Sequence, residues 1–187
     1  FIKTNSPSMD ILISSNLERF LFAATGQDAG KVSAWLGQLA EEGRFRIDQA
    51  THYRIKEILT AGYADETKTL GTIRQVYEKY DYTVDTHTAV GLQVYFDYVD
   101  RTGDHSVTVI DATASPFKFN RAVLEAIKGP EAVAGKDEFE ILGLLSKASQ
   151  MEIHPGLQNL DRKPVRHNRV TDKEGVKKAI EEILGLL

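Results

Sequence analysis

One segment of this sequence has a clear alternating apolar pattern of a β-strand, whereas helical periodicity runs through most of the remainder. In residues 106–113, this alternation places Val107, Val109, Asp111 and Thr113 on one face. A lone strand cannot satisfy its own backbone N–H and C=O groups, so it needs neighbouring strands. We therefore expect an α/β fold that is rich in helices and poor in strands, with the other strands in sequence outside this chain.

Helix-start and helix-stop signals predict the other elements. Ser15 and Glu18 have the spacing of a capping box, and Asp28 is placed to cap a second helix that ends at Gly43. Residues 86–100 carry apolar side chains nearly all round, which is typical of a buried helix. The expected helices occupy residues 15–21, 28–43, 50–61, 66–79, 86–100, 116–128, 137–145 and 171–187.

Weaker signals mark one short strand and two loops. Residues 44–47 form a second, weaker strand candidate. Residues 129–136 and 161–171 are expected to be loops. The second loop carries several basic side chains around a single proline, so it is either a solvated connection or a contact for an anion.

Composition excludes several classes of protein. The 187 residues fit one large domain or part of a two-domain protein. A net charge of −4 without a basic run argues against nucleic acid as a partner. The absence of cysteine excludes a disulfide framework and a thiolate zinc site. No apolar run approaches the ~20 residues of a membrane span, and no signal peptide precedes Phe1, so we expect a cytoplasmic protein.

The common catalytic and metal-binding motifs do not occur in the sequence. Its five histidines are scattered and form no HxxxH or HxH pair with nearby carboxylates, which argues against a metal site. The GxSxG, GxGxxG and GxxxxGK[ST] patterns are also missing. Function must therefore be sought in two less common stretches.

The first of these stretches crowds four polar residues at the start of the expected buried helix. Asp85, Thr86, His87 and Thr88 lie where the first-turn amides and the helix dipole favour polar partners. Capping by Asp85 or Thr86 explains one or two of the four. The alternative is a helix N-terminus that lines a polar pocket.

The second stretch follows the expected strand. Thr113 and Ser115 lie where this strand is succeeded by a helix, and in α/β folds ligands bind beyond the carboxyl ends of strands. Pro116 suits the first turn of a helix over 116–128. The strand end is therefore either a ligand contact or an ordinary N-cap formed by Ser115.

Three stretches together resemble threonine synthase, of the branch found in many bacteria and fungi. They read SPSMDILISSNLERFLF at residues 6–22, DTHTAVG at 85–91 and ATASPFKF at 112–119, and their order and spacing agree with that family. The resemblance implies the tryptophan-synthase-β-like fold, also called fold type II, of which this chain would be a helix-rich C-terminal part. It also implies pyridoxal 5′-phosphate as the cofactor.

The resemblance further implies a reaction and the role of one residue. The family converts O-phospho-L-homoserine and water to L-threonine and phosphate, as carbon–oxygen lyases acting on phosphates. A threonine of its TA-x-P-x-K-F motif contacts the pyridine nitrogen of the cofactor, and that position is Thr113. Asp111 departs from the pattern, because an apolar or small residue is expected there. The candidate pocket-lining residues carried over are Asp85, Thr86, His87, Thr88, Ser115 and Lys118.

The resemblance places the catalytic lysine outside this chain. In the family, the cofactor lysine and the glycine-rich phosphate cradle precede the SPSMDI stretch. No lysine of this sequence has the family's F-K-D context, and Lys118 belongs to a different motif. We therefore expect residues 1–187 to be a C-terminal portion of the catalytic fold. On its own it would be inactive, would hold no cofactor and would self-associate through uncovered apolar surface.

Two other functions remain open. One is a related phospho-lyase of the same fold that acts on another phosphorylated amino alcohol. The other is a stand-alone helical binding module that reuses the C-terminal part of the enzyme. An upstream reading frame with F-K-D and a glycine-rich loop would favour the enzyme, whereas a start codon next to Phe1 would favour the module.

Overall fold

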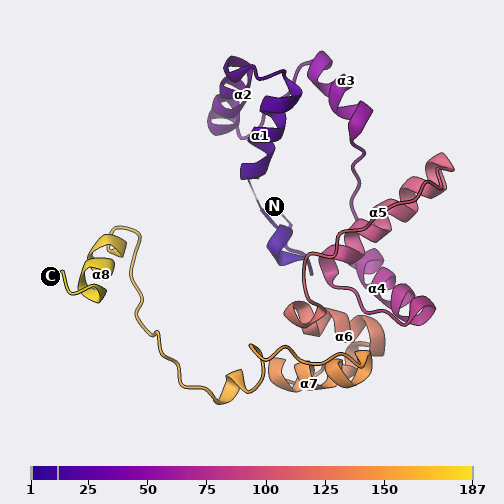
Figure 1. The fold of residues 1–187 in the computed structure, drawn as a ribbon, viewed down its shortest axis with the longest axis vertical. Coiled ribbons are helices and arrows are strands. Elements are labelled where there is room, and N and C mark those ends of the chain that lie inside the picture. Colours follow the sequence, from indigo (N-terminus) through magenta and orange to yellow (C-terminus); the bar gives the residue numbers. More distant parts are fainter. Residues whose placement is uncertain (1, 12, 187) are drawn as a thin grey trace. The chain divides into compact units, whose positions relative to one another are not determined.

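The computed structural model describes residues 2–11 and 13–186, and the chain divides into two compact units, residues 1–152 and 153–187 (Figure 1). The first unit contains, in chain order, the 3₁₀ helices (η) and α-helices η1 (Pro7–Met9), α1 (Ser15–Ala24), α2 (Ala29–Glu42), α3 (Gln49–Ile58), α4 (Glu66–Tyr80), α5 (Thr86–Thr102), η2 (Pro116–Phe119), α6 (Asn120–Lys128), η3 (Pro130–Ala132) and α7 (Glu138–Ser149). The second unit contains η4 (Leu160–Arg162) and α8 (Val176–Ile183). Within the described ranges, no helix is both long and apolar enough to cross a bilayer.

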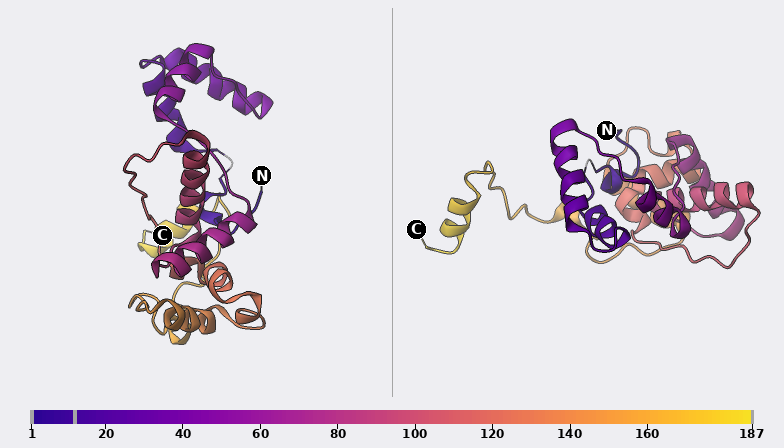
Figure 2. Two further views of the ribbon diagram at one scale, coloured as in Figure 1. Left: turned by 90° about the vertical axis from the view of Figure 1, so that its right-hand side faces the viewer. Right: turned by 90° about the horizontal axis from the view of Figure 1, so that it is seen from above.

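The core of the first unit lies among four helices. Helix α4 packs against α5 and α6, and α6 packs against α7, so that the four lie side by side (Figures 1 and 2). Each contributes apolar residues at helical spacing, and burial of such side chains is the main favourable term in folding. The buried side chains of this core include Ile73, Val76, Ala89, Val123, Leu124, Ile141 and Leu145.

Hydrogen bonds from long side chains fix how these helices pack. Arg74 Nε on α4 donates to the Ala126 carbonyl at 2.7 Å, and the Tyr77 hydroxyl donates to the Ala148 carbonyl at 2.8 Å. These two bonds join α4 to α6 and to the end of α7. They also satisfy backbone carbonyls near helix ends that would otherwise lack a partner.

The helix caps confirm most of the sequence predictions and correct one. Asp28 accepts a hydrogen bond from the Lys31 amide at 3.0 Å, and Gly43 ends α2 in the left-handed conformation. The capping box predicted for Ser15 is wrong, because Ser15 is already the first helical residue and Ser14 occupies the cap without a side-chain bond. Asp137, in contrast, forms a full capping box with Glu140 at the start of α7.

The predicted strand at residues 106–113 is also wrong for this chain. The described residues form no strand, and Figure 2 shows the connection between α5 and η2 as an irregular segment. The physical reason is the missing partner. Val107 is fully exposed, Val109 is 83% exposed, and the described residues offer no second strand to pair with their backbone. The weaker strand candidate at 44–47 is irregular as well.

Three helices differ in detail from their predictions. Helix α3 ends at Ile58 rather than at residue 61, and the predicted helix 116–128 is divided into η2 and α6. Helix α5 is not buried along its length. Thr86, Thr88 and Ala89 are buried in its first turn, whereas the remainder is half-buried or exposed.

The second unit is largely exposed. Helix α8 begins at Val176, later than the predicted start at Thr171. Apart from the short η4, the predicted loop 161–171 is irregular. Arg169 of this loop forms an ion pair with Glu182 and a hydrogen bond to the Ala179 carbonyl at 3.4 Å, so at least this basic side chain is used inside the unit.

Candidate functional site

The carboxylate of Asp85 caps the start of α5. One of its oxygens accepts hydrogen bonds from the His87 amide at 2.8 Å and from the Thr88 amide at 3.3 Å. The other oxygen accepts a hydrogen bond from the Thr88 hydroxyl. Asp85 is only 1% exposed, so these bonds satisfy a buried charge. The capping interpretation therefore accounts for Asp85 and Thr88, and it leaves Thr86 and His87 for other roles.

His87 joins three distant parts of the sequence. Its Nδ1 is hydrogen-bonded to the hydroxyl of Ser6, a residue 81 positions away that is itself buried. On another side, the His87 ring packs against Phe119 with ring centroids 4.5 Å apart. The start of α5, the segment around η1 and the end of η2 thus meet at this imidazole.

The surroundings of His87 keep it neutral near pH 7. Burial lowers the pKa of the imidazole because the charged form loses hydration. The negative charges of Asp85 and Asp10 oppose this shift, while the nearby Lys118 ammonium adds to it. With a lowered pKa, the imidazole offers one N–H donor and one acceptor nitrogen rather than two donors.

Two buried polar atoms at this place have no protein partner. Thr86 Oγ1 and His87 Nε2 are both shielded from solvent, and neither forms a hydrogen bond within the described part of the chain. Buried polar groups are normally satisfied, so each exception calls for a partner that the chain does not supply. Among the described residues, these two atoms are the strongest sign of a ligand or a missing protein segment at the start of α5.

The other predicted residues divide into a cap and two exposed side chains. Ser115 Oγ accepts a hydrogen bond from the Phe117 amide at 3.3 Å, which confirms the N-cap interpretation. Thr113 is exposed and forms no hydrogen bond among the residues described. Lys118 is exposed, and its Nζ lies 5.5 Å from the Phe119 ring centroid. The structure therefore brings Lys118 towards His87 and leaves the hydroxyl of Thr113 available.

Ser6 is the residue that sequence reasoning missed. It lies in the 6–22 stretch, but nothing in its local pattern connects it with His87. Only its position in a motif that occurs together with DTHTAVG could have drawn attention to it. Within residues 2–11 and 13–186, no group of three or more metal-ligating side chains occurs.

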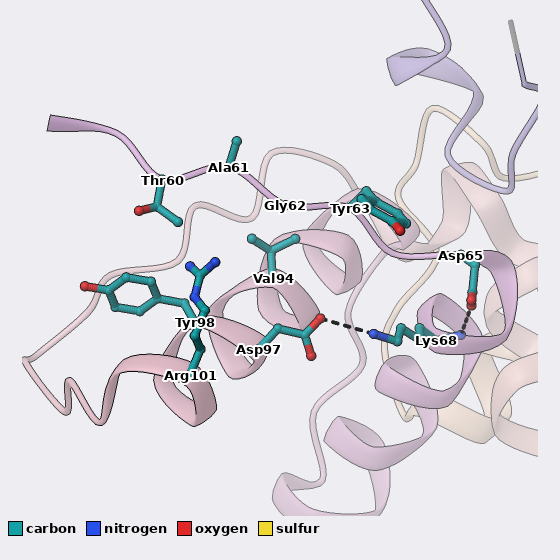
Figure 3. Close-up of a pocket in the computed structure, with 10 residues that line it drawn as sticks. All are labelled: Thr60, Ala61, Gly62, Tyr63, Asp65, Lys68, Val94, Asp97, Tyr98 and Arg101. Carbon is teal, nitrogen blue, oxygen red and sulfur yellow. Dashed lines mark hydrogen bonds and ion pairs between the residues drawn. The ribbon is translucent and has the colours of Figure 1, made fainter. Parts of the chain in front are cut away.

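A separate hollow of about 440 Å³ lies between α5 and the segment that leads into α4 (Figure 3). Lys68 and Asp97 point towards one another in it and form an ion pair at 3.2 Å. Hydrogen bonds from Lys68 and Gln93 lower the pKa of Asp97. A Cβ on Gly62 would come within 2.8 Å of a Val94 methyl carbon, so a larger residue there would require Val94 or the backbone to shift. None of the predicted site residues lines the hollow, and its lysine and aspartate neutralise each other.

Comparison with known proteins identifies a family. The family described as "Threonine synthase, C-terminal" matches residues 88–180. Threonine synthase of Methylobacillus glycogenes is 36% identical over 126 residues, which cover 66% of this chain and 26% of that protein. Threonine synthase of Saccharomyces cerevisiae is 36% identical over 140 residues, which cover 67% of this chain and 27% of that protein. Human threonine synthase-like 1 is 34% identical over 127 residues, which cover 67% of this chain and 17% of that protein.

A solved structure agrees with these matches. The PLP-bound threonine synthase from Brucella melitensis superimposes with a TM-score of 0.62 and 31% sequence identity, covering 80% of this chain and 35% of that one. The chain spans about a quarter of the length of the curated threonine synthases that it matches. On these findings, the chain corresponds to a C-terminal portion of threonine synthase-like proteins.

Proposed function

We propose that residues 1–187 are part of a pyridoxal-phosphate-dependent lyase that converts O-phospho-L-homoserine and water to L-threonine and phosphate. The proposal rests on one observation above all, the match of residues 88–180 to the C-terminal part of threonine synthase. The likeness to a PLP-bound member supports the cofactor. The proposal includes a cytoplasmic location, in line with a sequence that lacks cysteine.

The residues of this chain fit only one edge of the cofactor. Thr113 offers an exposed hydroxyl without a partner among the described residues, which suits a hydrogen bond to a ring nitrogen. A doubly negative phosphate needs several backbone amides or cations around it. The amides at the start of α5 do not provide this, because those of His87 and Thr88 already bind Asp85. The phosphate group and the reactive aldehyde are therefore assigned to the rest of the parent enzyme.

In this proposal, Thr113 adjusts the electronic properties of the cofactor. Pyridoxal phosphate supplies an electron sink for carbanion chemistry when it is bound. A neutral hydroxyl, unlike a carboxylate, can accept or donate a hydrogen bond without forcing a proton onto the ring nitrogen. Thr113 is thus proposed to orient the ring rather than to carry out a proton transfer.

Asp85, Thr86, His87, Thr88, Ser115 and Lys118 are proposed to build one wall of the pocket. The unpartnered atoms Thr86 Oγ1 and His87 Nε2 support this placement. Asp85, Thr88 and Ser115 would act indirectly, since their polar atoms hold the backbone of α5 and η2. Lys118 would add a positive charge next to the imidazole.

A related phospho-lyase is the second candidate. It is favoured by the 34% identity to human threonine synthase-like 1, a relative whose name separates it from threonine synthase itself. Such an enzyme would keep the fold and the cofactor but act on another phosphorylated amino alcohol. The residues that select the substrate would then differ in the parent, outside this chain.

Expression of the complete reading frame that contains this chain separates the candidates. We expect the purified protein to show the visible absorption of bound PLP. We also expect it to release phosphate from O-phospho-L-homoserine with formation of L-threonine. O-Phosphoethanolamine serves as the comparison substrate. If the enzyme turns over O-phosphoethanolamine faster, the related phospho-lyase is the better assignment. If the reading frame begins next to Phe1 and its product binds no PLP, both enzyme proposals are contradicted.

A further inference from the structure

A hollow of about 420 Å³ lies between α6, η3 and α7, away from every residue discussed above as part of the cofactor pocket. Its floor consists of the side chains of Leu124, Ala132, Leu144 and Ala148. The volume falls within the ~300–1,000 Å³ that is common for small-molecule sites. The floor offers no polar side-chain atom, so it can accept only an apolar group.

Three lysines surround this apolar floor. Lys128 ends α6, Lys136 lies in the turn before α7, and Lys147 lies in the last turn of α7. None of the three forms an ion pair within residues 2–11 and 13–186, whereas other lysines do, as in the Lys31–Asp48 pair at 3.0 Å. The hollow therefore concentrates positive charge in a chain whose net charge is −4.

No carboxylate neutralises the three ammonium groups from within the hollow, because no aspartate or glutamate lines it. On α7, Glu140 lies one turn before Leu144, and its carboxylate accepts a hydrogen bond from the Asp137 amide at 2.9 Å in the capping box. A bound anion would offset the positive charge of the three lysines that line the hollow.

The walls of the hollow are held in place by the fold itself. Arg121 joins α6 to the following turn through hydrogen bonds to the Val133 carbonyl at 3.0 Å and the Lys136 carbonyl at 2.8 Å. The Tyr77 hydroxyl holds the Ala148 carbonyl, and Lys128 Nζ lies 5.7 Å from the centroid of the same tyrosine ring. A site with fixed walls loses less entropy when a ligand binds.

We propose that this hollow binds a small organic anion with an apolar body, in which a carboxylate or phosphate head meets the lysines and the body covers the leucine and alanine floor. An inorganic anion would leave the apolar floor uncovered, and a zwitterion would bring an ammonium group among three others. The site shares no residue with the proposed cofactor pocket, so it is independent of the proposed function.

The probe for this site is octanoate, which combines a carboxylate with an alkyl chain, and 1-octanol is the neutral control. We expect a methyl-resolved NMR titration of the 187-residue chain to show saturable shifts for the floor residues Leu124, Ala132, Leu144 and Ala148. Octanol should bind at least about tenfold more weakly, since it lacks the charge. Added salt should weaken octanoate binding, because it screens exposed charges.

Charge-removing variants locate the binding. Lys136→Gln and Lys147→Gln should each raise the octanoate Kd about threefold, the effect of losing one exposed ionic contact. The matched control is Lys56→Gln on α3, which lines a different apolar hollow together with Phe20 and Ile55. Circular dichroism shows whether each variant is folded. If Lys136→Gln or Lys147→Gln is not folded, Lys128→Gln is used in its place.

Several results would overturn the proposal. Equal affinities for octanoate and octanol would show that the lysines take no part in binding. An effect of Lys56→Gln as large as that of Lys136→Gln would place the binding elsewhere. Shifts of the floor methyl groups with a glutamate-rich peptide, but not with octanoate or octyl phosphate, would make the surface a protein-binding one.

Discussion

At the scale of single residues, His87 provides the clearest dependence on pH. Burial lowers its pKa in the folded chain, whereas an unfolded histidine titrates near ~6.5. As the pH falls below about 6.5, the unfolded state binds a proton first, so the free energy of unfolding decreases until the pH reaches the lowered folded pKa. Above about 6.5, His87 is neutral in both states and contributes no pH dependence.

We expect His87→Gln to remove this decrease between neutral and mildly acidic pH. Urea unfolding at pH 7.5 and pH 5.5 measures the difference for the wild-type chain and the variant. His52→Gln is the control, because His52 is an exposed histidine on α3. If His87→Gln and His52→Gln leave the same pH dependence, the account of the buried imidazole is wrong.

Thr113 is expected to matter for turnover rather than for folding. In the parent enzyme, Thr113→Ala removes a neutral hydrogen bond of about 0.5–1.5 kcal/mol, which corresponds to a fall in kcat of roughly twofold to tenfold. The unfolding midpoint should stay the same, because the hydroxyl is exposed and bonded to no described residue. Thr108→Ala, on the same exposed segment, is the control. An unchanged kcat for Thr113→Ala would exclude the assigned role.

The sequence predicted local roles of residues better than distant contacts. The caps formed by Asp85 and Ser115 follow from residue type and position relative to a helix start, and both occur in the structure. The bond between Ser6 and His87 depends on how segments 81 positions apart pack, and no local pattern encodes that.

At the scale of elements, the start of α3 should be sensitive to acid. Asp48 accepts a hydrogen bond from the Thr51 amide at 2.8 Å and pairs with Lys31 at 3.0 Å. The amide bond first, and Lys31 second, lower the pKa of Asp48 to about 2. The lowered pKa means that this stabilisation is present above the unfolded pKa of ~3.9 and is lost as the pH falls from there towards 2.

Asp48→Asn tests this electrostatic contribution, because asparagine keeps the capping geometry and lacks the charge. We expect the variant to show a smaller loss of stability between pH 4 and pH 2 than the wild-type chain. Thermal unfolding followed by circular dichroism provides the measurement, with Asp100→Asn on the exposed side of α5 as control. Parallel acid profiles for all three proteins would contradict the prediction.

The segment 106–113 shows why a strand predicted from its sequence pattern need not form. Its alternation is that of a strand, but strand formation depends on a partner, and the described residues offer none. Helices satisfy their own backbone, so periodicity predicted where α1 to α7 occur, although α3 ends earlier than predicted and the helix predicted at 116–128 is divided into η2 and α6. The same reasoning explains α5, whose apolar side chains beyond the first turn lack a covering surface.

We therefore expect the isolated chain to self-associate or bind a hydrophobic dye through this segment. Val109→Asp should reduce both effects, because it places a charge on an exposed apolar edge. The matched control is Val165→Asp, since Val109 and Val165 are both 83% exposed. Sedimentation and dye fluorescence measure the two effects. A wild-type chain that is strictly monomeric and binds no dye would contradict the expectation.

At the scale of the whole molecule, we propose that the cofactor's partners are divided between this chain and the rest of the parent enzyme. In this proposal, this chain supplies Thr113 and the group around His87, and the rest of the parent supplies the lysine and the phosphate cradle. A single hydrogen bond from Thr113 cannot hold a doubly charged cofactor, so the chain alone should neither select pyridoxal phosphate nor release phosphate from O-phospho-L-homoserine.

Reductive labelling tests whether this chain alone contains a cofactor site. The pure chain is mixed with pyridoxal phosphate, reduced with borohydride and digested, and the labelled lysines are mapped while phosphate release is assayed in parallel. We expect scattered, substoichiometric labelling of surface lysines and no release of phosphate. Stoichiometric labelling of one lysine, together with phosphate release from O-phospho-L-homoserine, would show that this chain contains the active site and would contradict the account.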